Sequence, residues 1–433
     1  MKRKIVCGVN RLAGVVVLLC TVAISAPADI ITVTNTNDSG PGSLRNALAI
    51  ANNGDTIQFA VTGTIGLTTG ELVVDKSVTI SGPGAANLAI DGNAQSRVFH
   101  ITPGTAASIS GVTIANGDAS GDSGGGIYND HAAVTLDNCT ISGNSTQDGL
   151  GGGIYNYGIG GIAMLEITDS TLSGNSAAQG GAVFNNGSDS GHAIIGIISS
   201  TLVANSAGFA GAIFNYGEAG TVTLTIENST VSDNSAQTYG GAIYNDGQSS
   251  GSAILATTIS TFSGNSAGAF GGGIFNIGGT GSEATVNLAN TILKTGSAGD
   301  NIVNAMGTVI SLGYNLSNDN GGGYLSGPGD QINTDPMLGP LQDNGGATLT
   351  HELLPGSPAI DTGDPNFTPP PLYDQRGPGF DRVVNGRIDI GSFEVQGSTP
   401  SPTATPTATP TPTPCTSRCS PTPRPRPTPA PRP

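Results

Sequence analysis

The sequence has little of several kinds of residue, and each shortage excludes a class of protein. Tryptophan is absent, aromatic residues make up 5% of the 433 residues, and charged residues make up 11%. Only five cysteines occur, two of them (Cys415 and Cys419) near the end, so disulfides do not hold the fold together. No lysine or arginine stands between Arg97 and Lys294, and acidic residues outnumber basic ones by 31 to 15. Because phosphate contacts need cations, nucleic acid is excluded as a partner of the folded part.

The first 28 residues have the pattern of a secretory signal peptide. Basic residues precede an apolar run over residues 12–24, and Ala26 and Ala28 fit an A-x-A cleavage site. The run is too short for a transmembrane helix, which needs about 20 apolar residues. We therefore expect a mature chain that begins at Asp29, is secreted or displayed on a bacterial outer surface, and has no transmembrane segment.

Two short patterns recur with one period and define the architecture. A pattern of the form GGxIYN occurs six times, and successive copies begin 27 to 31 residues apart. Its copies begin at Gly124, Gly151, Gly180, Ala210, Gly240 and Gly271. A second pattern, of the form TxSGNS, alternates with the first from residue 140 onward. Two interleaved patterns with one period indicate a single structural unit that is repeated along the chain.

The composition of the unit predicts strands, because glycine, serine, threonine, asparagine and β-branched residues disfavour helices. A unit of this length makes one coil of three short strands, and each coil stacks about 4.8 Å above the last. We therefore predict an all-β fold, a right-handed single-stranded parallel β-helix of the pectate-lyase type. We expect it to be a monomer.

Stacking the coils aligns like residues into columns. Two aliphatic columns form the predicted core: Ile127, Ile154, Val183, Ile213, Ile243 and Ile274; and Ile141, Leu172, Leu202, Val231, Phe262 and Leu293. Alternation along a strand turns the residue after each isoleucine outward, which gives an aromatic column of Tyr128, Tyr155, Phe184, Phe214, Tyr244 and Phe275. A structural asparagine ladder is expected at Asn144, Asn175, Asn205, Asn234 and Asn265, where stacked amides can bond from coil to coil.

The chain divides into five segments. After the signal peptide (1–28), residues 29–110 form an N-terminal cap and early coils, with Ser43 capping a short helix. Regular repeats fill 111–295, and a C-terminal cap fills 296–397. The segment 398–433, almost all Pro, Thr, Ser, Ala and Arg, cannot bury enough apolar surface to fold and is predicted to be disordered.

Three stretches resemble known families. The repeats GGAIYN and FSGN are similar to those of polymorphic outer membrane proteins, and Thr32–Phe59 resembles the CSLREA-type segment, from which Gly42 and Asn46 depart. Residues 312–395, with TDPMLGPLQDNGGATLTHELLPGSPAIDTGD and DIGSFE, resemble the choice-of-anchor Q domain. These resemblances imply an exported, surface-associated β-helix and no defined reaction.

A rival interpretation is an enzyme that degrades pectin-like polysaccharides, by lyase or hydrolase chemistry. A lyase needs a basic residue to remove a proton, and no lysine or arginine stands between Arg97 and Lys294. A hydrolase needs two carboxylates flanking the scissile bond. Asp137 with Asp169, and Asp118 with Asp148, lie about one period apart and are the candidates.

Neither pair continues in the next coils, so chance spacing explains both pairs more simply than an active site. His131 and His192 are interpreted as solvated loop residues without partners, and the charged residues of 376–389 as ion pairs that pin the cap. No catalytic residue and no cofactor are therefore predicted. A calcium requirement is left open, because the acids of the repeats are scattered.

The aromatic column allows two interpretations. Its rings can stack on successive sugars of a glycan, or loops and neighbouring rings can cover them. The predicted function is non-enzymatic binding of a glycan, matrix or cell-surface component. The alternatives are a carbohydrate-active enzyme with an unrecognised acid site, and a structural spacer.

Overall fold

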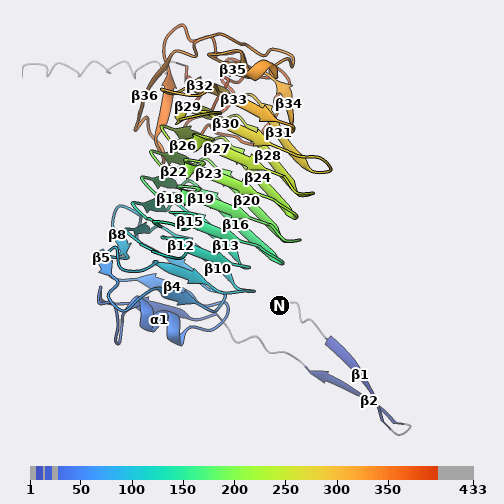
Figure 1. Ribbon diagram of the computed structural model, residues 1–433. Helices are drawn as coiled ribbons and strands as arrows, with labels where there is room; N and C mark the ends of the chain where they lie inside the picture. The colour runs from blue at the N-terminus through green and yellow to red at the C-terminus, as the bar shows by residue number, and fades with distance from the viewer. Residues whose placement is uncertain (1–5, 13–14, 22–27, 398–433) are drawn as a thin grey trace, which may run out of the picture. The chain divides into compact units, whose positions relative to one another are not determined.

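The computed structural model describes residues 6–12, 15–21 and 28–397. Three parallel sheets form the stacked coils, and the chain visits them in turn (Figure 1). The first sheet contains β3 (Ile30–Val33), β4 (Thr56–Phe59), β7 (Thr79–Ser81), β10 (Ala106–Ser110), β13 (Ala133–Asp137), β16 (Ile162–Thr168), β20 (His192–Ile198), β24 (Thr221–Glu227), β28 (Ser252–Thr258), β31 (Glu283–Ala289) and β34 (Thr308–Gly313).

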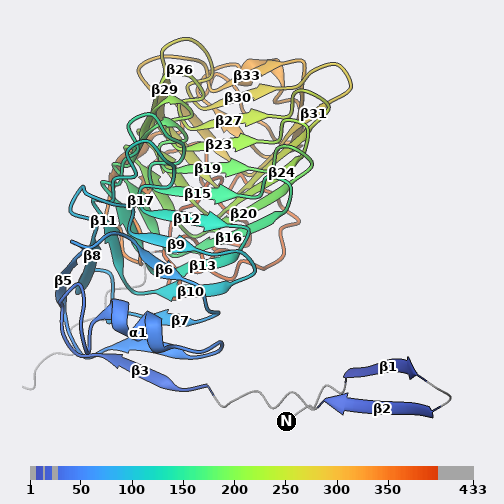
Figure 2. The same cartoon turned by 60° about the horizontal axis from the view of Figure 1, so that its bottom comes forward.

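The second and third sheets complete each coil. The second contains β5 (Gly63–Gly66), β8 (Leu88–Asp91), β11 (Thr113–Ala115), β14 (Thr140–Ser142), β17 (Thr171–Ser173), β21 (Thr201–Val203), β25 (Thr230–Ser232), β29 (Thr261–Ala267), β32 (Ile292–Thr295) and β35 (Leu316–Ser317), extended by β18 (Ser176–Gln179), β22 (Ser206–Phe209) and β26 (Ser235–Tyr239). The third sheet, whose strands lie one above another in Figure 2, contains β6 (Leu72–Val74), β9 (Phe99–Ile101), β12 (Ile127–Asp130), β15 (Ile154–Tyr157), β19 (Val183–Asn186), β23 (Ile213–Tyr216), β27 (Ile243–Asp246), β30 (Ile274–Ile277) and β33 (Ile302–Ala305).

The strand register between neighbouring coils pairs residues of the same kind, as the repeat predicted. Ile127 pairs with Ile154 and Ile154 with Val183 in the third sheet, and Ile141 pairs with Leu172 in the second. Both predicted aliphatic columns are buried in one continuous core. The predicted parallel β-helix is therefore confirmed.

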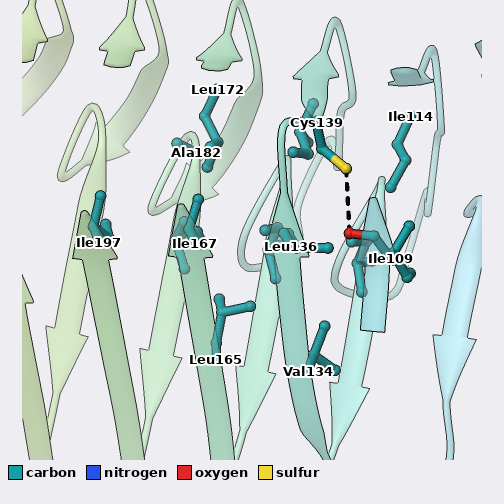
Figure 3. Close-up of a cluster of buried hydrophobic side chains, with 14 of the residues drawn as sticks. Ile109, Ile114, Val134, Leu136, Cys139, Leu165, Ile167, Leu172, Ala182 and Ile197 are labelled. Atoms are coloured by element: carbon teal, nitrogen blue, oxygen red, sulfur yellow. Dashed lines mark hydrogen bonds between the residues drawn. The ribbon is translucent and has the colours of Figure 1, made fainter. Parts of the chain in front are cut away.

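The first sheet supplies a third side of the core. Figure 3 shows Ile109, Leu136, Ile167 and Ile197 on successive strands, with Cys139 beside them. The Cys139 thiol is buried and donates a long hydrogen bond of 3.5 Å to the Ile109 carbonyl oxygen. Burial raises the pKa of this thiol to about 11, so it acts as a small core residue rather than a reactive group.

A short helix, α1 (Leu44–Ile50), closes the N-terminal end of the core. The Ser43 hydroxyl accepts from the Asn46 N–H, as an N-cap does, and Leu44, Ala47 and Leu48 are buried. β5 was not expected from the sequence, because its Gly-Thr-Ile-Gly stretch carries a single buried side chain.

The C-terminal segment differs from the cap that the sequence predicted. Strands β33, β34 and β35 continue the coils beyond residue 295, and buried Leu325, just after η1 (Gly321–Gly323), joins the end of the core. Residues 336–396, here called the C-terminal strap, instead run back along the flank of the second sheet and contain β36 (Leu338–Gln342) and β37 (Thr350–Leu353). The stacked coils therefore extend one coil beyond residue 295, the end of the regular repeats in the sequence.

The strap is attached through buried polar contacts. The Gln375 side chain donates to Thr201 Oγ1 at 2.9 Å and accepts from Thr230 Oγ1 at 2.6 Å. The charged residues of the strap are partly paired, Arg376 with Asp374 at 2.6 Å and Arg382 with Glu394 at 3.4 Å. The acidic partners, Asp374 and Glu394, both lie outside the stretch 376–389 in which the sequence analysis placed the ion pairs.

The first residues form an antiparallel pair of strands, β1 (Val6–Leu12) and β2 (Val15–Thr21). The signal peptide stays a prediction. The predicted disordered segment 398–433, with Cys415 and Cys419, lies outside the described residues.

Thr257 occupies a core position that holds Ile226 and Leu288 in the neighbouring coils. Its side chain is fully buried, and its hydroxyl has no hydrogen-bond partner among the described residues. We expect Thr257→Val to raise the free energy of unfolding by about 1–2 kcal/mol, because it removes an unsatisfied hydroxyl at constant shape. Chemical denaturation checks this, with Thr258→Val on the outer face as the control. A loss of stability at Thr257 would contradict the assignment.

Candidate binding groove

The aromatic column is continuous, but it is not a free surface. Successive rings from Tyr128 to Phe275 lie 4.4 to 5.7 Å apart, in the register that the repeat predicted. The five rings from Tyr155 to Phe275 are only 2–8% exposed. Burial also raises the pKa of Tyr155 to about 12. Neighbouring side chains therefore cover these five rings, as the second interpretation expects, while Tyr128 is partly exposed.

Residues that the sequence analysis overlooked cover the rings. Phe209 and Tyr239 immediately precede the small-residue pairs at the corners and pack over Tyr244. Tyr157 and Tyr216 stand two positions beyond ring residues, on the same face of the strand, and pack against Tyr155 and Phe214. The sequence shows this spacing of two residues, and because side chains alternate between the two faces of a strand, residues two apart lie side by side on one face. Together they form a second apolar layer outside the coils.

The structure places the five predicted asparagines in one buried ladder, here called the turn ladder. Each Nδ2 donates to Oδ1 of the next asparagine, with distances of 3.0, 2.9, 2.9 and 2.9 Å from Asn144 to Asn265. Each Nδ2 also donates to a backbone carbonyl oxygen, as Asn205 does to Leu172 at 3.0 Å. The amides are therefore satisfied in the interior and are structural, not available to a ligand.

A second ladder, here called the strand ladder, was not among the predicted sites. It consists of Asn129, Asn156, Asn185, Asn215, Asn245, Asn276 and Asn304, joined by Nδ2 to Oδ1 bonds of 2.6–2.8 Å. The first six are the last residues of the GGxIYN patterns, and Asn304 is in register with Asn276 in the next coil. Their recurrence was visible in the sequence, and their inward direction follows from the outward ring before them.

The open polar feature is a groove of about 580 Å³ along the outer edge of the second sheet. The last serines of the first four TxSGNS patterns line it, and these residues, Ser145, Ser176, Ser206 and Ser235, are in register with one another. Alanines at the next position and Gln147 and Gln237 complete the wall. Small side chains leave the concavity open, and the hydroxyls offer donors and acceptors in a row.

A second hollow of about 410 Å³ meets the groove, because Asp118 lines both. Arg97, Glu71 and Asp122 form its charged wall. The Arg97 guanidinium pairs with Glu71 at 2.6 Å and with Asp122 at 2.7 Å, and it lies 4.9 Å from the centre of the Tyr128 ring. These residues come from successive early coils, about 26 positions apart. Because the sequence of those coils is irregular, no repeat pattern predicts that these three residues meet.

The electrostatics of this hollow do not favour acid catalysis. The hydrogen bond with His100 is the main cause that lowers the pKa of Glu71, and the charge of Arg97 adds to it. Burial alone would raise the pKa of Asp122, but hydrogen bonds from Arg97 and the Ser123 N–H hold it below its usual value. Neither carboxyl therefore keeps a proton near neutral pH to give to a leaving group.

The histidines differ from the prediction of solvated loop residues. His131 lies in the turn after β12, and its Nδ1 is 2.5 Å from Asp130 Oδ1 while Nε2 contacts the Ile159 carbonyl oxygen at 2.8 Å. His192 is the first residue of β20 rather than a loop residue. The pairing of His131 depends on tight turns between the strands, which the spacing alone did not reveal.

The two predicted acid pairs do not combine in either hollow. Burial and the charge of Asp137 raise the pKa of Asp169, yet neither residue lines the groove or the second hollow. Asp118 pairs with Ser145, so Asp148 is three positions out of register with it. Among residues 6–12, 15–21 and 28–397, no three His, Cys, Asp or Glu side chains are grouped as metal ligands. Within the same ranges, no helix has the length and apolarity to cross a membrane.

Comparison with known proteins gives one family match. The Chlamydia polymorphic membrane protein repeat matches residues 228–246, which run from just before β25 to the end of β27. No curated protein matches the chain. A solved structure titled "Crystal structure of pectate lyase Pel9A" is similar at 13% identity, with a TM-score of 0.42, covering 86% of this chain and 98% of that chain. The resemblances to the CSLREA-type segment and the choice-of-anchor Q domain stay predictions.

Proposed function

We propose that this chain is a secreted or cell-surface β-helix protein that binds a glycan strand along the serine-lined groove, without chemical turnover. The observation that carries the proposal is the row of in-register serines from Ser145 to Ser235, which repeats one hydroxyl per coil. The row and Asp118 together span about 19 Å at ordinary strand spacing. A polymer with a repeated hydroxyl pattern can bond to such a row at several points. The match of residues 228–246 to a polymorphic membrane protein repeat supports display outside the cell.

A second candidate is glycoside hydrolysis or polysaccharide cleavage in the Arg97 hollow. Its supporting observation is that one guanidinium holds Glu71 and Asp122 close together beside a concave surface. Two observations oppose it: both carboxyl pKa values are lowered, and the Arg97 guanidinium is 6% exposed and hydrogen-bonded to both carboxylates. A lyase base and a hydrolase acid are therefore both lacking in this hollow.

Filling the groove tests the binding function. Ser206 is exposed at the centre of the serine row, so Ser206→Trp blocks the path without disturbing the core. We expect retention on the polysaccharide that binds the natural chain to fall at least about tenfold, since a blocked contact of about 1.4 kcal/mol changes affinity by that factor. Thr225→Trp, at an exposed position of β24, is the matched control and keeps full retention.

The same incubations separate the alternatives. The purified chain is mixed with a panel of insoluble polysaccharides, and both retention and new reducing or unsaturated ends are measured. New ends would establish an enzyme and overturn the proposal. Retention that Ser206→Trp and Thr225→Trp leave equally intact would place binding elsewhere, and no retention on any polymer would favour a spacer.

A further inference from the structure

We infer that the groove selects a cationic glycan, one whose sugars carry free amino groups. The inference rests on the proposed function and specifies its ligand class. The groove begins in the hollow where the side chains of Glu71, Asp118 and Asp122 stand around a single cation, Arg97. An ammonium group is the complement of such a wall, whereas a uronate would be repelled by it.

Most of the Arg97 donors are used within the protein. Its Nη1 donates to Glu71, its Nη2 to Asp122 and the Ser123 carbonyl oxygen, and its Nε to the carbonyl oxygens of Ser123 and Gly124. The side chain is 6% exposed. The Asp122 side chain, by contrast, is 67% exposed. A ligand in the hollow therefore meets carboxylate oxygens and not the guanidinium.

The remainder of the groove does not offset this negative charge. From Ser145 to Gln237 its wall is made of serine, threonine, alanine and glutamine, and the sequence has no lysine or arginine from residue 98 to residue 293. Asp118 joins the two hollows, so its carboxylate faces any strand that passes from one to the other. The field along the groove is consequently negative at one end and uncompensated along its length.

Two hydroxyls in the walls are unpaired. Thr146, which lines the groove and is 2% exposed, has no partner for Oγ1 among the described residues. Ser96, in the wall of the Arg97 hollow, has none for Oγ in the same part of the chain. An unsatisfied buried hydroxyl costs stability, and a polar ligand or its bound water can satisfy it. These groups point to a polar occupant at the junction that carries the carboxylates.

An organic cation fits better than a metal ion. The carboxylates of this hollow do not converge with other His, Cys, Asp or Glu side chains into a metal-binding group in the described ranges. Two of them already share the guanidinium of Arg97. Separated carboxylates along a path suit amines that are spaced along a polymer, each making one charge-assisted hydrogen bond.

The test compares two polymers that differ in the amine alone. Full-length protein is incubated with chitosan beads, whose amines are free, and with chitin beads, whose amines are acetylated. We expect retention on chitosan to exceed that on chitin at least about fivefold, and to fall with salt, because exposed charge pairs are screened. Asp118→Asn lowers retention on chitosan about threefold to fivefold, and Glu166→Gln, on the exposed face of β16, leaves it unchanged.

Each outcome decides a separate point. Equal or stronger binding to chitin would overturn the amine inference and leave the proposed glycan binding standing. An equal loss with Asp118→Asn and Glu166→Gln would show that net charge, not the groove, attracts the polymer, and would also overturn the inference. Because Asp118 accepts one side-chain hydrogen bond, from Ser120 at 2.7 Å, the amide variant is expected to fold normally. Ser206→Trp provides a second, uncharged variant that must also lose chitosan if the groove is the site.

Discussion

Replacing Asn205 with alanine is expected to lower the free energy of unfolding by about 3–5 kcal/mol, because the change leaves several buried groups unpaired at once. Asn205 is fully buried in the middle of the turn ladder. Its Oδ1 accepts from both the N–H and Nδ2 of Asn175, and its Nδ2 donates to Asn234 Oδ1 and the Leu172 carbonyl oxygen. Alanine can replace none of these contacts.

Chemical denaturation monitored by circular dichroism measures the effect. The control is Asn138→Gly, at an exposed position with φ of 50°, where glycine suits the left-handed backbone and the stability changes by less than about 1 kcal/mol. A loss below about 1 kcal/mol for Asn205→Ala would mean that water or neighbouring side chains replace the amide. In that case the ladder would not stabilise the stack.

Gly152→Ala is expected to destabilise the chain by about 3 kcal/mol, because its methyl group would overlap the backbone of the next coil. A Cβ atom at Gly152 would lie 2.3 Å from the Ser176 carbonyl oxygen and 2.6 Å from that of Gly181. Backbone atoms held by coil-to-coil hydrogen bonds cannot move aside cheaply, so the coils must separate locally. Thermal unfolding followed by circular dichroism gives the shift.

A glycine with open space around it offers a matched control. Gly196 lies on β20, and a Cβ atom there would have no heavy atom within 4 Å. Gly196→Ala is therefore expected to cost less than about 1 kcal/mol. If both variants unfolded at the same temperature, close approach of the coils at Gly152 would not be the reason for its glycine.

The fold was predictable because its determinants repeat. Ile127 and its equivalents recur with one period, and so do the asparagines of the turn ladder, so a single alignment of the repeat fixes the strands, the register and the inward columns. Ser43 was likewise recognisable as a helix cap from local chemistry. Periodic and local signals need no knowledge of distant contacts.

The candidate site was less predictable because its determinants do not repeat. Arg97, Glu71 and Asp122 meet only after three irregular early coils have stacked, and no period reveals their register. The attachment of Gln375 to Thr201 joins residues 174 positions apart, which the sequence pattern does not specify. The outward direction of the rings was predicted, but whether other side chains cover them depends on Phe209 and Tyr239 from another part of each coil.

The two asparagine ladders give the stack a polarity. In both, every amide-to-amide bond runs from an Nδ2 to the Oδ1 of the asparagine in the next coil toward the C-terminal end, so the amide dipoles add instead of cancelling. A duplicated coil inserted between two existing ones would receive a donor from below and offer one above, so the array can lengthen by whole coils. The strand ladder begins at Asn129, whose Oδ1 has no partner in the described part of the chain and stands beside Ile101. A further coil on the N-terminal side of Asn129 would therefore donate a hydrogen bond to this Oδ1.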